Sequence, residues 1–211
     1  MNENNDKGEL LWQMDRALGG PDEEYYVLIS NKGVTAVLRP EYGGIDFYDI
    51  HGNCKTIIPF EDALGWGLRV YKGIWNAEGT LFAVSVTKHY VRSKIPEPWL
   101  ILYDINGNEI WKSRLKGHLP HKILVSPSGY YIIIQVDGDV YLLNRGTHIM
   151  HKMPGIGDSR MRVTFSSNEN KFAMFIPKDS TLYLIESAAG EILWTKKINL
   201  RRFIKRYDVY F

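Results

Sequence analysis

Three things are scarce in this chain: cysteine, long apolar runs and net charge. Cys54 is the only cysteine, which excludes an intrachain disulfide, and we interpret it as a reduced, buried thiol. No run approaches the roughly 20 apolar residues that a membrane-spanning helix needs. The first six residues are polar and acidic, which is the wrong chemistry for a signal peptide. These absences predict a cytoplasmic location and no membrane partner.

The formal net charge is +2, so no global field favours nucleic acid or an anionic membrane. The densest group of cations lies toward the C-terminal end and comprises Lys196, Lys197, Arg201, Arg202, Lys205 and Arg206. Such a group could bind nucleic acid or an acidic partner. Basic side chains more often protect the edge of a sheet from pairing with another chain, and we favour this interpretation over nucleic acid.

Motifs of known catalytic chemistry are also missing. The sequence contains no Gly-x-Ser-x-Gly motif and no phosphate-binding loop. His118 and His121 have no third ligand at a suggestive spacing. The run Asp137-Gly138-Asp139 resembles a fragment of a calcium loop, but we interpret it as a hairpin turn. The sequence predicts no metal and no cofactor, and it favours a non-catalytic protein over an enzyme.

What the chain does contain is a repeated turn. Its clearest copy runs from Tyr103 through Gly107 to Trp111, and we interpret it as a strand end, a tight turn and the start of the next strand. The turn glycines stand at intervals of 44, 55, 39 and 44 residues, at Gly8, Gly52, Gly107, Gly146 and Gly190. Glycine suits a hairpin turn because it accepts a positive φ without steric cost. Periods near 40–45 residues are typical of propeller blades.

Short β-branched and aromatic runs, separated by turn signals, fill the space between these glycines. Four strands are expected in each repeat, which is the composition of a propeller blade. The predicted strands are 25–30, 34–39, 45–48 and 54–58; 68–71, 81–87, 99–103 and 109–114; 122–126, 130–136, 140–143 and 148–152; 162–166, 171–176, 182–185 and 191–196.

Two short patterns resemble those of known propeller families. The spacing Gly-x-x-x-Trp occurs at Gly8/Trp12, Gly107/Trp111 and Gly190/Trp194. It is similar to the tryptophan-docking motif of quinoprotein (PQQ-like) blades, and the runs 117–118 (Gly-His) and 126–129 (Ser-Pro-Ser-Gly) resemble elements of a WD repeat. The chain therefore resembles the WD-repeat and PQQ-like β-propeller superfamily. The resemblance implies that the tryptophan of the outer strand packs between neighbouring blades, and it implies no quinone cofactor.

The predicted fold class is all-β and β-propeller-like, with about four four-stranded antiparallel blades and strand pieces at both ends. We expect one domain over residues 1–211, with blades at 25–59, 66–115, 121–153 and 161–198. Extra strands are expected at 9–14 and 202–211, although the apolar residues near 9–14 also fit one face of a helix. If the ring does not close alone, two copies of the chain could share it, so a homo-oligomer is possible.

One end of the predicted blades carries a long insertion, residues 88–98, between the second and third strands of the second repeat. In an antiparallel blade this connection lies at the same end as the links between successive blades. Loops carry binding residues more often than strands do. The candidate binding residues on this face are His89, Tyr90, Arg92, Lys94, His118, His121, Asp158 and Arg160. The alternative is that the insertion only covers a sheet edge.

Three functions remain open at this level. The favoured one is a non-catalytic module that binds or scaffolds a protein or peptide partner. A second is an enzyme acting on a small molecule or sugar derivative, with its site at a central channel. A third is a structural fragment that works only after joining another chain. Propeller folds host all three, so the repeat alone does not decide between them.

Overall fold

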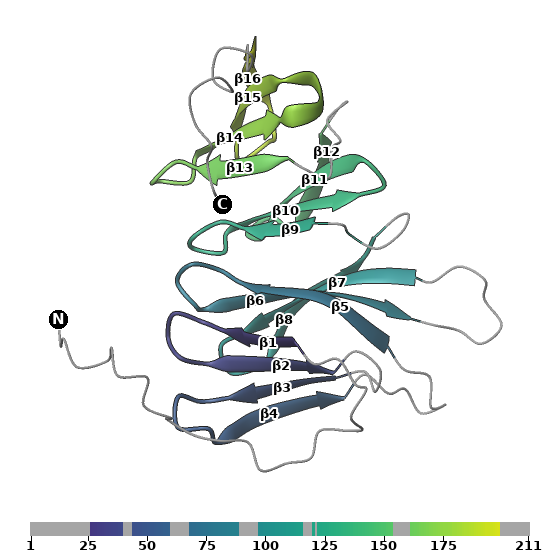
Figure 1. Cartoon of the computed structure of the whole chain (residues 1–211), viewed down its shortest axis with the longest axis vertical. Helices are drawn as coiled ribbons and strands as arrows, with labels where there is room; N and C mark the ends of the chain where they lie inside the picture. Colours follow the sequence, from purple (N-terminus) through teal and green to yellow (C-terminus); the bar gives the residue numbers. More distant parts are fainter. Residues whose placement is uncertain are drawn as a thin grey trace, which may run out of the picture. The chain divides into compact units, whose positions relative to one another are not determined.

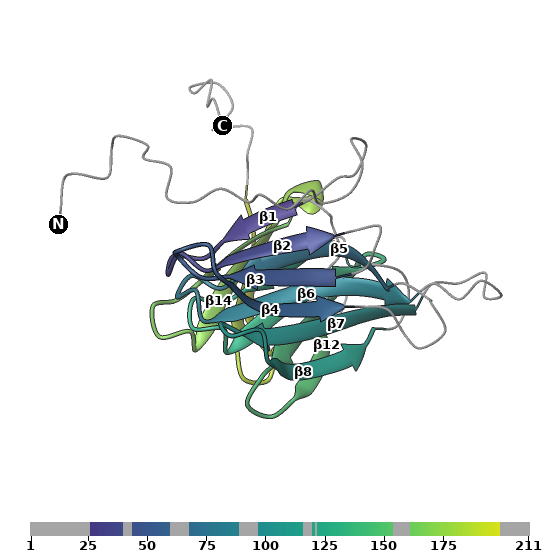
Figure 2. The same cartoon turned by 90° about the horizontal axis from the view of Figure 1, so that it is seen from below.

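A computed structural model describes residues 26–39, 44–59, 68–88, 97–115, 120, 122–153 and 161–198. These residues form β-strands and the turns between them, with one short 3-10 helix, η1 (Pro177–Asp179). The strands assemble into four sheets of four strands each (Figure 1). In every sheet the strands pair antiparallel with their neighbours along the chain, and Figure 2 shows β1 to β4 side by side in that order.

The first two sheets lie in one compact unit, residues 1–119. The first sheet consists of β1 (Tyr26–Ile29), β2 (Thr35–Arg39), β3 (Gly44–Tyr48) and β4 (Cys54–Pro59). The second sheet consists of β5 (Leu68–Trp75), β6 (Leu81–Lys88), β7 (Glu97–Asp104) and β8 (Glu109–Arg114).

The third and fourth sheets lie in a second compact unit, residues 120–211. The third sheet consists of β9 (Lys122–Val125), β10 (Tyr131–Val136), β11 (Asp139–Asn144) and β12 (Ile149–Met153). The fourth sheet consists of β13 (Arg162–Phe165), β14 (Lys171–Ile176), β15 (Thr181–Glu186) and β16 (Ile192–Lys197). The two units are described separately below, and the single domain expected over the whole chain stays a prediction.

The four-strand repeat predicted from the turn glycines is confirmed in all four sheets. Most strand ends agree within a residue or two, and two local differences have clear causes. His148 was expected to begin a strand but belongs to a turn, because its φ is 58° and β12 starts at Ile149. Strand β5 runs on to Trp75, past the predicted end at residue 71.

Gly73 explains the longer strand β5. A Cβ atom at Gly73 would lie 2.4 Å from the ring of Phe82 on the neighbouring strand β6. Glycine inside a strand often marks such a close approach, so Gly73 leaves room for an aromatic ring rather than ending the strand.

The core of the first unit is aromatic at its centre. Phe47 of the first sheet meets Trp75 and Phe82 of the second edge-to-face, at centroid distances of 5.9 and 5.7 Å. The indole N–H of Trp75 also donates to the backbone oxygen of Leu28, at 3.1 Å. Edge-to-face pairs contribute roughly 0.5–1.5 kcal/mol each beyond the area they bury. The first and second sheets are therefore packed face to face by aromatic rings.

The core of the second unit is more aliphatic. Buried side chains of the third sheet pack there against buried side chains of the fourth sheet, among them Ile133, Leu142 and Met153 against Phe172, Met174 and Ile185. The turn Asp137-Gly138 between β10 and β11 has a positive φ at both residues, 49° and 83°. Two positive φ angles are the signature of the tight hairpin turn, as predicted for this run.

One core prediction is wrong. Cys54 was expected to be buried, but it is exposed. It is the first residue of β4, the outermost strand of its sheet, and it follows directly on a turn. The strand shift between Phe47 and Tyr48 changes the alternation of faces at this point. The predicted terminal strands, 9–14 and 202–211, lie outside the described residues.

Candidate interaction surface

The turns between the third and fourth strands, here called outer turns, are built alike in the first two sheets. In residues 104–108, the Asp104 carboxylate accepts from the backbone N–H groups of Asn106 and Asn108 at 2.8 and 2.9 Å, and from the Asn108 side chain at 2.8 Å. Asp49 makes the same three bonds, with His51 and Asn53, at 2.8–3.0 Å. The sequence Asp-Ile-x-Gly-Asn therefore specifies one turn geometry twice.

The hydrogen bonds also lower the pKa of the Asp49 and Asp104 carboxyls. Bonds from Asn53 lower the pKa of Asp49 below its ordinary value. Burial works to raise the pKa of Asp104, but bonds from Asn108 and Asn106 outweigh it and the net pKa is lowered. Both turns are therefore held by carboxylates that stay ionised.

The outer turn of the second sheet docks on the first sheet. A Cβ atom at Gly107 would lie 3.0 Å from Thr56 and 3.1 Å from Phe47. Thr56 and Phe47 are cross-strand partners on β4 and β3. Thr56 donates its hydroxyl to the backbone oxygen of Asn106 at 2.7 Å, and Lys55 donates to the Asn106 side chain at 2.8 Å. The turn glycine thus sits over one cross-strand pair of the preceding sheet.

The second unit repeats this arrangement. Gly190, in the outer turn of the fourth sheet, lies over Leu142 and His151 of the third sheet, with a Cβ position 3.5 and 3.7 Å away. Leu142 and His151 are again cross-strand partners. In both units the turn glycine of one sheet meets the third- and fourth-strand pair of the sheet before it.

The position that receives the turn glycine is the one the sequence marked with tryptophan. In the first and third sheets, the fourth-strand residue that contacts the turn glycine of the next sheet is Thr56 and His151, respectively. Trp194 holds the equivalent position in the fourth sheet, because it pairs with Leu184 as His151 pairs with Leu142. Trp194 is 44% exposed. The expected packing of this tryptophan between blades is therefore wrong for the described part of the fourth sheet.

A second set of contacts joins the turns between the first and second strands, here called inner turns. Each has a residue with positive φ at the same place: Gly33, Gly79, Gly129 and Glu169. In the first unit, Asn31 donates its side-chain amide to the backbone oxygen of Ala77, and a Cβ atom at Gly79 would collide with it. Glycine is required at Gly79 by both the φ angle and this neighbour.

Glu169 is the exception, and its side chain makes the contact instead. Its carboxylate accepts from the Ser126 hydroxyl at 2.8 Å, the Ser128 hydroxyl at 2.6 Å and the Ser128 backbone N–H at 2.6 Å. These serines form the inner turn of the third sheet. Burial works to raise the pKa of Glu169, but the bonds from Ser128 and Ser126 outweigh it and the net pKa is lowered. Glu169 is therefore a charged clamp between the third and fourth sheets.

The outer side of the fourth sheet, which faces away from the third, is apolar and incompletely covered. We call it the fourth-sheet outer face and define it by Ala173, Phe175, Leu182, Leu184 and Trp194. The equivalent residues Ile133, Val140 and Leu142 of the third sheet are fully buried, whereas Leu182 and Leu184 are half-buried. Every residue of β16 is exposed. The fourth sheet therefore has the same apolar face as the third sheet, but its side chains on that face are more exposed to solvent.

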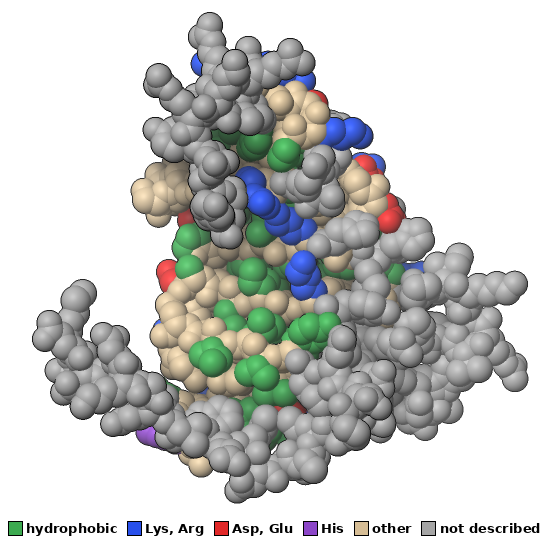
Figure 3. Space-filling model, in the orientation of Figure 1, with side chains coloured by type: hydrophobic (Ala, Val, Ile, Leu, Met, Phe, Trp, Pro, Cys, Tyr) green, Lys and Arg blue, Asp and Glu red, His purple; other side chains and the backbone are tan. Residues whose placement is uncertain are grey.

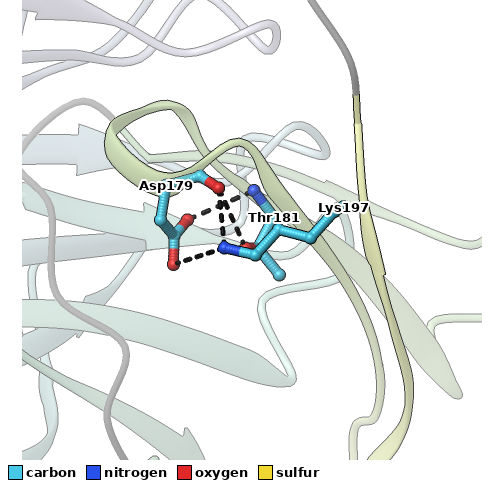
Figure 4. Close-up of polar contacts among 3 residues, drawn as sticks. All are labelled: Asp179, Thr181 and Lys197. Atoms are coloured by element: carbon cyan, nitrogen blue, oxygen red, sulfur yellow. Dashed lines mark hydrogen bonds and ion pairs between the residues drawn. The ribbon is translucent and has the colours of Figure 1, made fainter.

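The end of β16 is anchored locally. Lys197 donates to the backbone oxygen of Asp179 at 2.8 Å, and the Asp179 carboxylate accepts from the backbone N–H of Thr181 at 3.2 Å (Figure 4). The backbone N–H of Ile198 also bonds Ser180 at 2.7 Å. One residue of the predicted basic group thus holds the turn after η1 against the last strand. These bonds anchor the C-terminal end of β16.

The side of the first sheet that faces away from the second also exposes apolar groups. We call it the first-sheet front face and define it by Val27, Ile29, Ile50 and Ile57, which are 56, 68, 49 and 45% exposed. Figure 3 shows hydrophobic side chains gathered over β1 and β2. The equivalent of Ile50 in the second sheet, Ile105, packs against the core of the first unit. The inner strands of this side are nevertheless buried, because Val37 and Asp46, the cross-strand partners of Val27 and Ile57, are 0 and 1% exposed. Only the outer strands and the outer turn of the first sheet therefore expose apolar groups on this side.

The predicted binding residues cannot be placed against these surfaces. His89, Tyr90, Arg92, Lys94, His118, His121, Asp158 and Arg160 all lie outside the described residues, so the insertion face stays a prediction. The fourth-sheet outer face was not predicted from the sequence, because the Gly-x-x-x-Trp spacing of Gly190 and Trp194 does not distinguish an exposed tryptophan from a buried one. Among the described residues no three His, Cys, Asp or Glu side chains converge as a metal site would require, and no helix there is long and apolar enough to cross a membrane.

Comparison with known proteins bears on the fold. No protein-family model matches the chain, and no curated protein matches it. Among solved structures the chain is similar to the β-propeller domain of Cps50 (Swd1) from Myceliophteria thermophila, with a TM-score of 0.56 and 12% identity, over 84% of this chain and 56% of that one. It is also similar to dihydro-heme d1 dehydrogenase NirN, solved in complex with DHE, with a TM-score of 0.52 and 17% identity, over 80% of this chain and 37% of that one.

The chain thus spans less than two thirds of the length of either solved protein. At these identities the likeness concerns the fold and not the activity. Four four-stranded antiparallel sheets and the likeness to the Cps50 domain together show that this chain has an all-β, β-propeller-like fold.

Proposed function

We infer that this chain is a non-catalytic protein-interaction module whose contact surface is the fourth-sheet outer face. The observation that carries the proposal is Trp194, which is 44% exposed at the position where the first and third sheets receive a turn of the next sheet. Tryptophan is among the residues that most often dominate protein interfaces, because its large rigid ring loses little conformational entropy on binding. Half-buried Leu182 and Leu184 widen the apolar area around it.

The flanking charges fit an interface that is apolar at its centre and polar at its rim. Arg162 and Lys196 share a row with Phe175 and Leu182 across the sheet, and both are exposed. Charged rims mainly set the rate and selectivity of association, while the central apolar residues provide the affinity.

Photo-crosslinking in the cells that make the protein tests this proposal. A benzophenone amino acid is placed at position 194 or, as a control, at position 149, because Ile149 is 51% exposed on β12 of another sheet. We expect a protein adduct at 194 and none at 149, with the partner identified by mass spectrometry. Trp194→Ala should then weaken binding of the purified partner at least tenfold, and Ile149→Ala should not. Equal adducts at both positions, or none, would contradict the proposal.

A further inference from the structure

The outer turn of the second sheet contains Asn106 followed directly by Gly107, and no other asparagine in the sequence is followed by glycine. Asparagine loses its side-chain amide most readily before glycine, because glycine has no side chain to hinder attack by its own backbone nitrogen. Asn106 is exposed, so water reaches it, whereas Gly107 is buried. The most reactive asparagine of the chain therefore lies at the contact between the second sheet and the first.

The docked turn engages the reacting groups in hydrogen bonds. The reaction needs the backbone nitrogen of Gly107 to reach Cγ of Asn106, but this N–H donates to the backbone oxygen of Asp104 at 3.1 Å. The Asn106 side-chain oxygen accepts from Lys55 at 2.8 Å, and its backbone oxygen accepts from Thr56 at 2.7 Å. Lys55 and Thr56 belong to β4 of the first sheet. Release of the turn from β4 therefore frees Asn106 to react.

We propose that Asn106 is a site of spontaneous deamidation and backbone isomerisation whose rate is set by docking of the outer turn on β4. In the released turn the Gly107 nitrogen forms a bond to Cγ of Asn106, and the bond from Cγ to the amide nitrogen breaks. The amide group leaves as ammonia with the proton of the Gly107 nitrogen. Water then opens the resulting cyclic imide at either of its carbonyls, which gives aspartate or isoaspartate without any oxidant or reductant.

The two products affect the contact between the sheets differently. Aspartate at position 106 leaves the backbone unchanged and places a carboxylate beside the Lys55 ammonium group, so the turn docks again. Isoaspartate routes the backbone through Cγ and lengthens it by a methylene group. Gly107 then no longer fits over Thr56 and Phe47, which lie only 3.0 and 3.1 Å from its Cβ position. A brief release of the turn is thereby converted into a permanent one.

The first sheet shows that the turn itself does not require an asparagine at this position. The turn 49–53 has the same carboxylate-centred hydrogen bonds, and His51 occupies the place of Asn106. Asn106→His should therefore keep the turn and the stability of the chain while it abolishes the reaction. This variant separates the chemistry of the side chain from the geometry of the turn.

The test is incubation of the purified chain at neutral pH in heavy-oxygen water, followed by digestion and mass spectrometry of the peptide that contains Asn106. Incorporated heavy oxygen measures total conversion, and methylation by a protein-isoaspartate methyltransferase measures isoaspartate. We expect Asn106 to convert more slowly in the folded chain than in the same chain unfolded in urea. A reaction from a briefly opened state follows the population of that state.

Thr56→Val removes the hydroxyl that bonds the turn and keeps the shape of the side chain. It should speed conversion of the folded chain roughly two- to tenfold, the factor expected for one hydrogen bond, and leave the rate in urea unchanged. Thr195→Val is the matched control and should change neither rate, because Thr195 is an exposed threonine of the fourth strand in the fourth sheet, in the second unit.

The stability of the converted chain completes the test. The isoaspartyl form, enriched by chromatography, should unfold at a lower denaturant concentration than the natural chain, whereas Asn106→Asp should not. Equal conversion rates in the folded and unfolded chain, or a Thr56→Val chain that converts no faster than the natural one, would overturn control by docking. An isoaspartyl chain as stable as the natural chain would overturn the permanent release of the turn.

Discussion

Replacing Gly107 by alanine is expected to lower the free energy of unfolding by about 3 kcal/mol. Two costs add at this position. The backbone φ is 84°, where a residue with a Cβ atom loses roughly 1–2 kcal/mol. The new methyl group would also lie 3.0 Å from Thr56 and 3.1 Å from Phe47, and overpacking a tight contact costs roughly 1–3 kcal/mol. Denaturant unfolding followed by circular dichroism measures the change.

Gly138→Ala separates the two costs. Gly138 has nearly the same φ, 83°, but no atom lies within 4 Å of the Cβ position. Alanine there should cost only the backbone strain, about 1 kcal/mol. Equal losses for the two variants would mean that the contact of the outer turn with the first sheet contributes nothing, and would remove the basis for docking by turn glycines.

Replacing Glu169 by alanine is expected to cost about 2–4 kcal/mol, because three hydrogen bonds to a largely buried carboxylate are lost together. The donors are the hydroxyls of Ser126 and Ser128 and the Ser128 backbone N–H. Glu169→Gly loses the same bonds but relieves the strain of the 55° φ angle, so it should be more stable than the alanine variant by about 1 kcal/mol. Glu169→Gln keeps a hydrogen-bond acceptor, so its free energy of unfolding should fall least of the three variants.

The same carboxylate predicts a dependence of stability on pH. The pKa of Glu169 is lowered in the folded chain from an ordinary value of 4.5. Its ionised form therefore stabilises the fold fully above about pH 4.5, and this contribution is lost as the pH falls through the lower folded pKa. Unfolding free energies of the natural chain and of Glu169→Gln should converge as the pH drops through this range. A constant difference between them down to the most acid pH would contradict the clamp.

The repeated turns could be predicted from the sequence because their geometry is local. Asp104 and Gly107 stand three residues apart, and the hydrogen bonds and φ angle that they need involve only their own turn. The alternation of short apolar runs with such turns was enough to predict sixteen strands in four repeats, all of which are present. Gly73 interrupts this pattern but does not end its strand. A glycine is needed there because the ring of Phe82, on the next strand, occupies the space that a Cβ atom would take.

The candidate surfaces could not be predicted in the same way, because exposure is a property of what packs against a residue. Trp194 and Trp111 share one sequence spacing, and nothing in that spacing reveals that Trp194 stays 44% exposed. Glu169 replaces the glycine of the other inner turns, and only the position of Ser126 and Ser128, some 40 residues earlier in the chain, turns this exception into a clamp.

The sequence by itself therefore determined the all-β class, the four repeats and the chemistry of their turns, because strand alternation and turn formation depend on neighbours in the chain. The tertiary structure alone decided which apolar faces are covered, which turn glycine meets which strand pair, and where Cys54 and Trp194 meet solvent. These properties depend on contacts between sheets whose residues lie about 40 or more positions apart, and no local pattern encodes them.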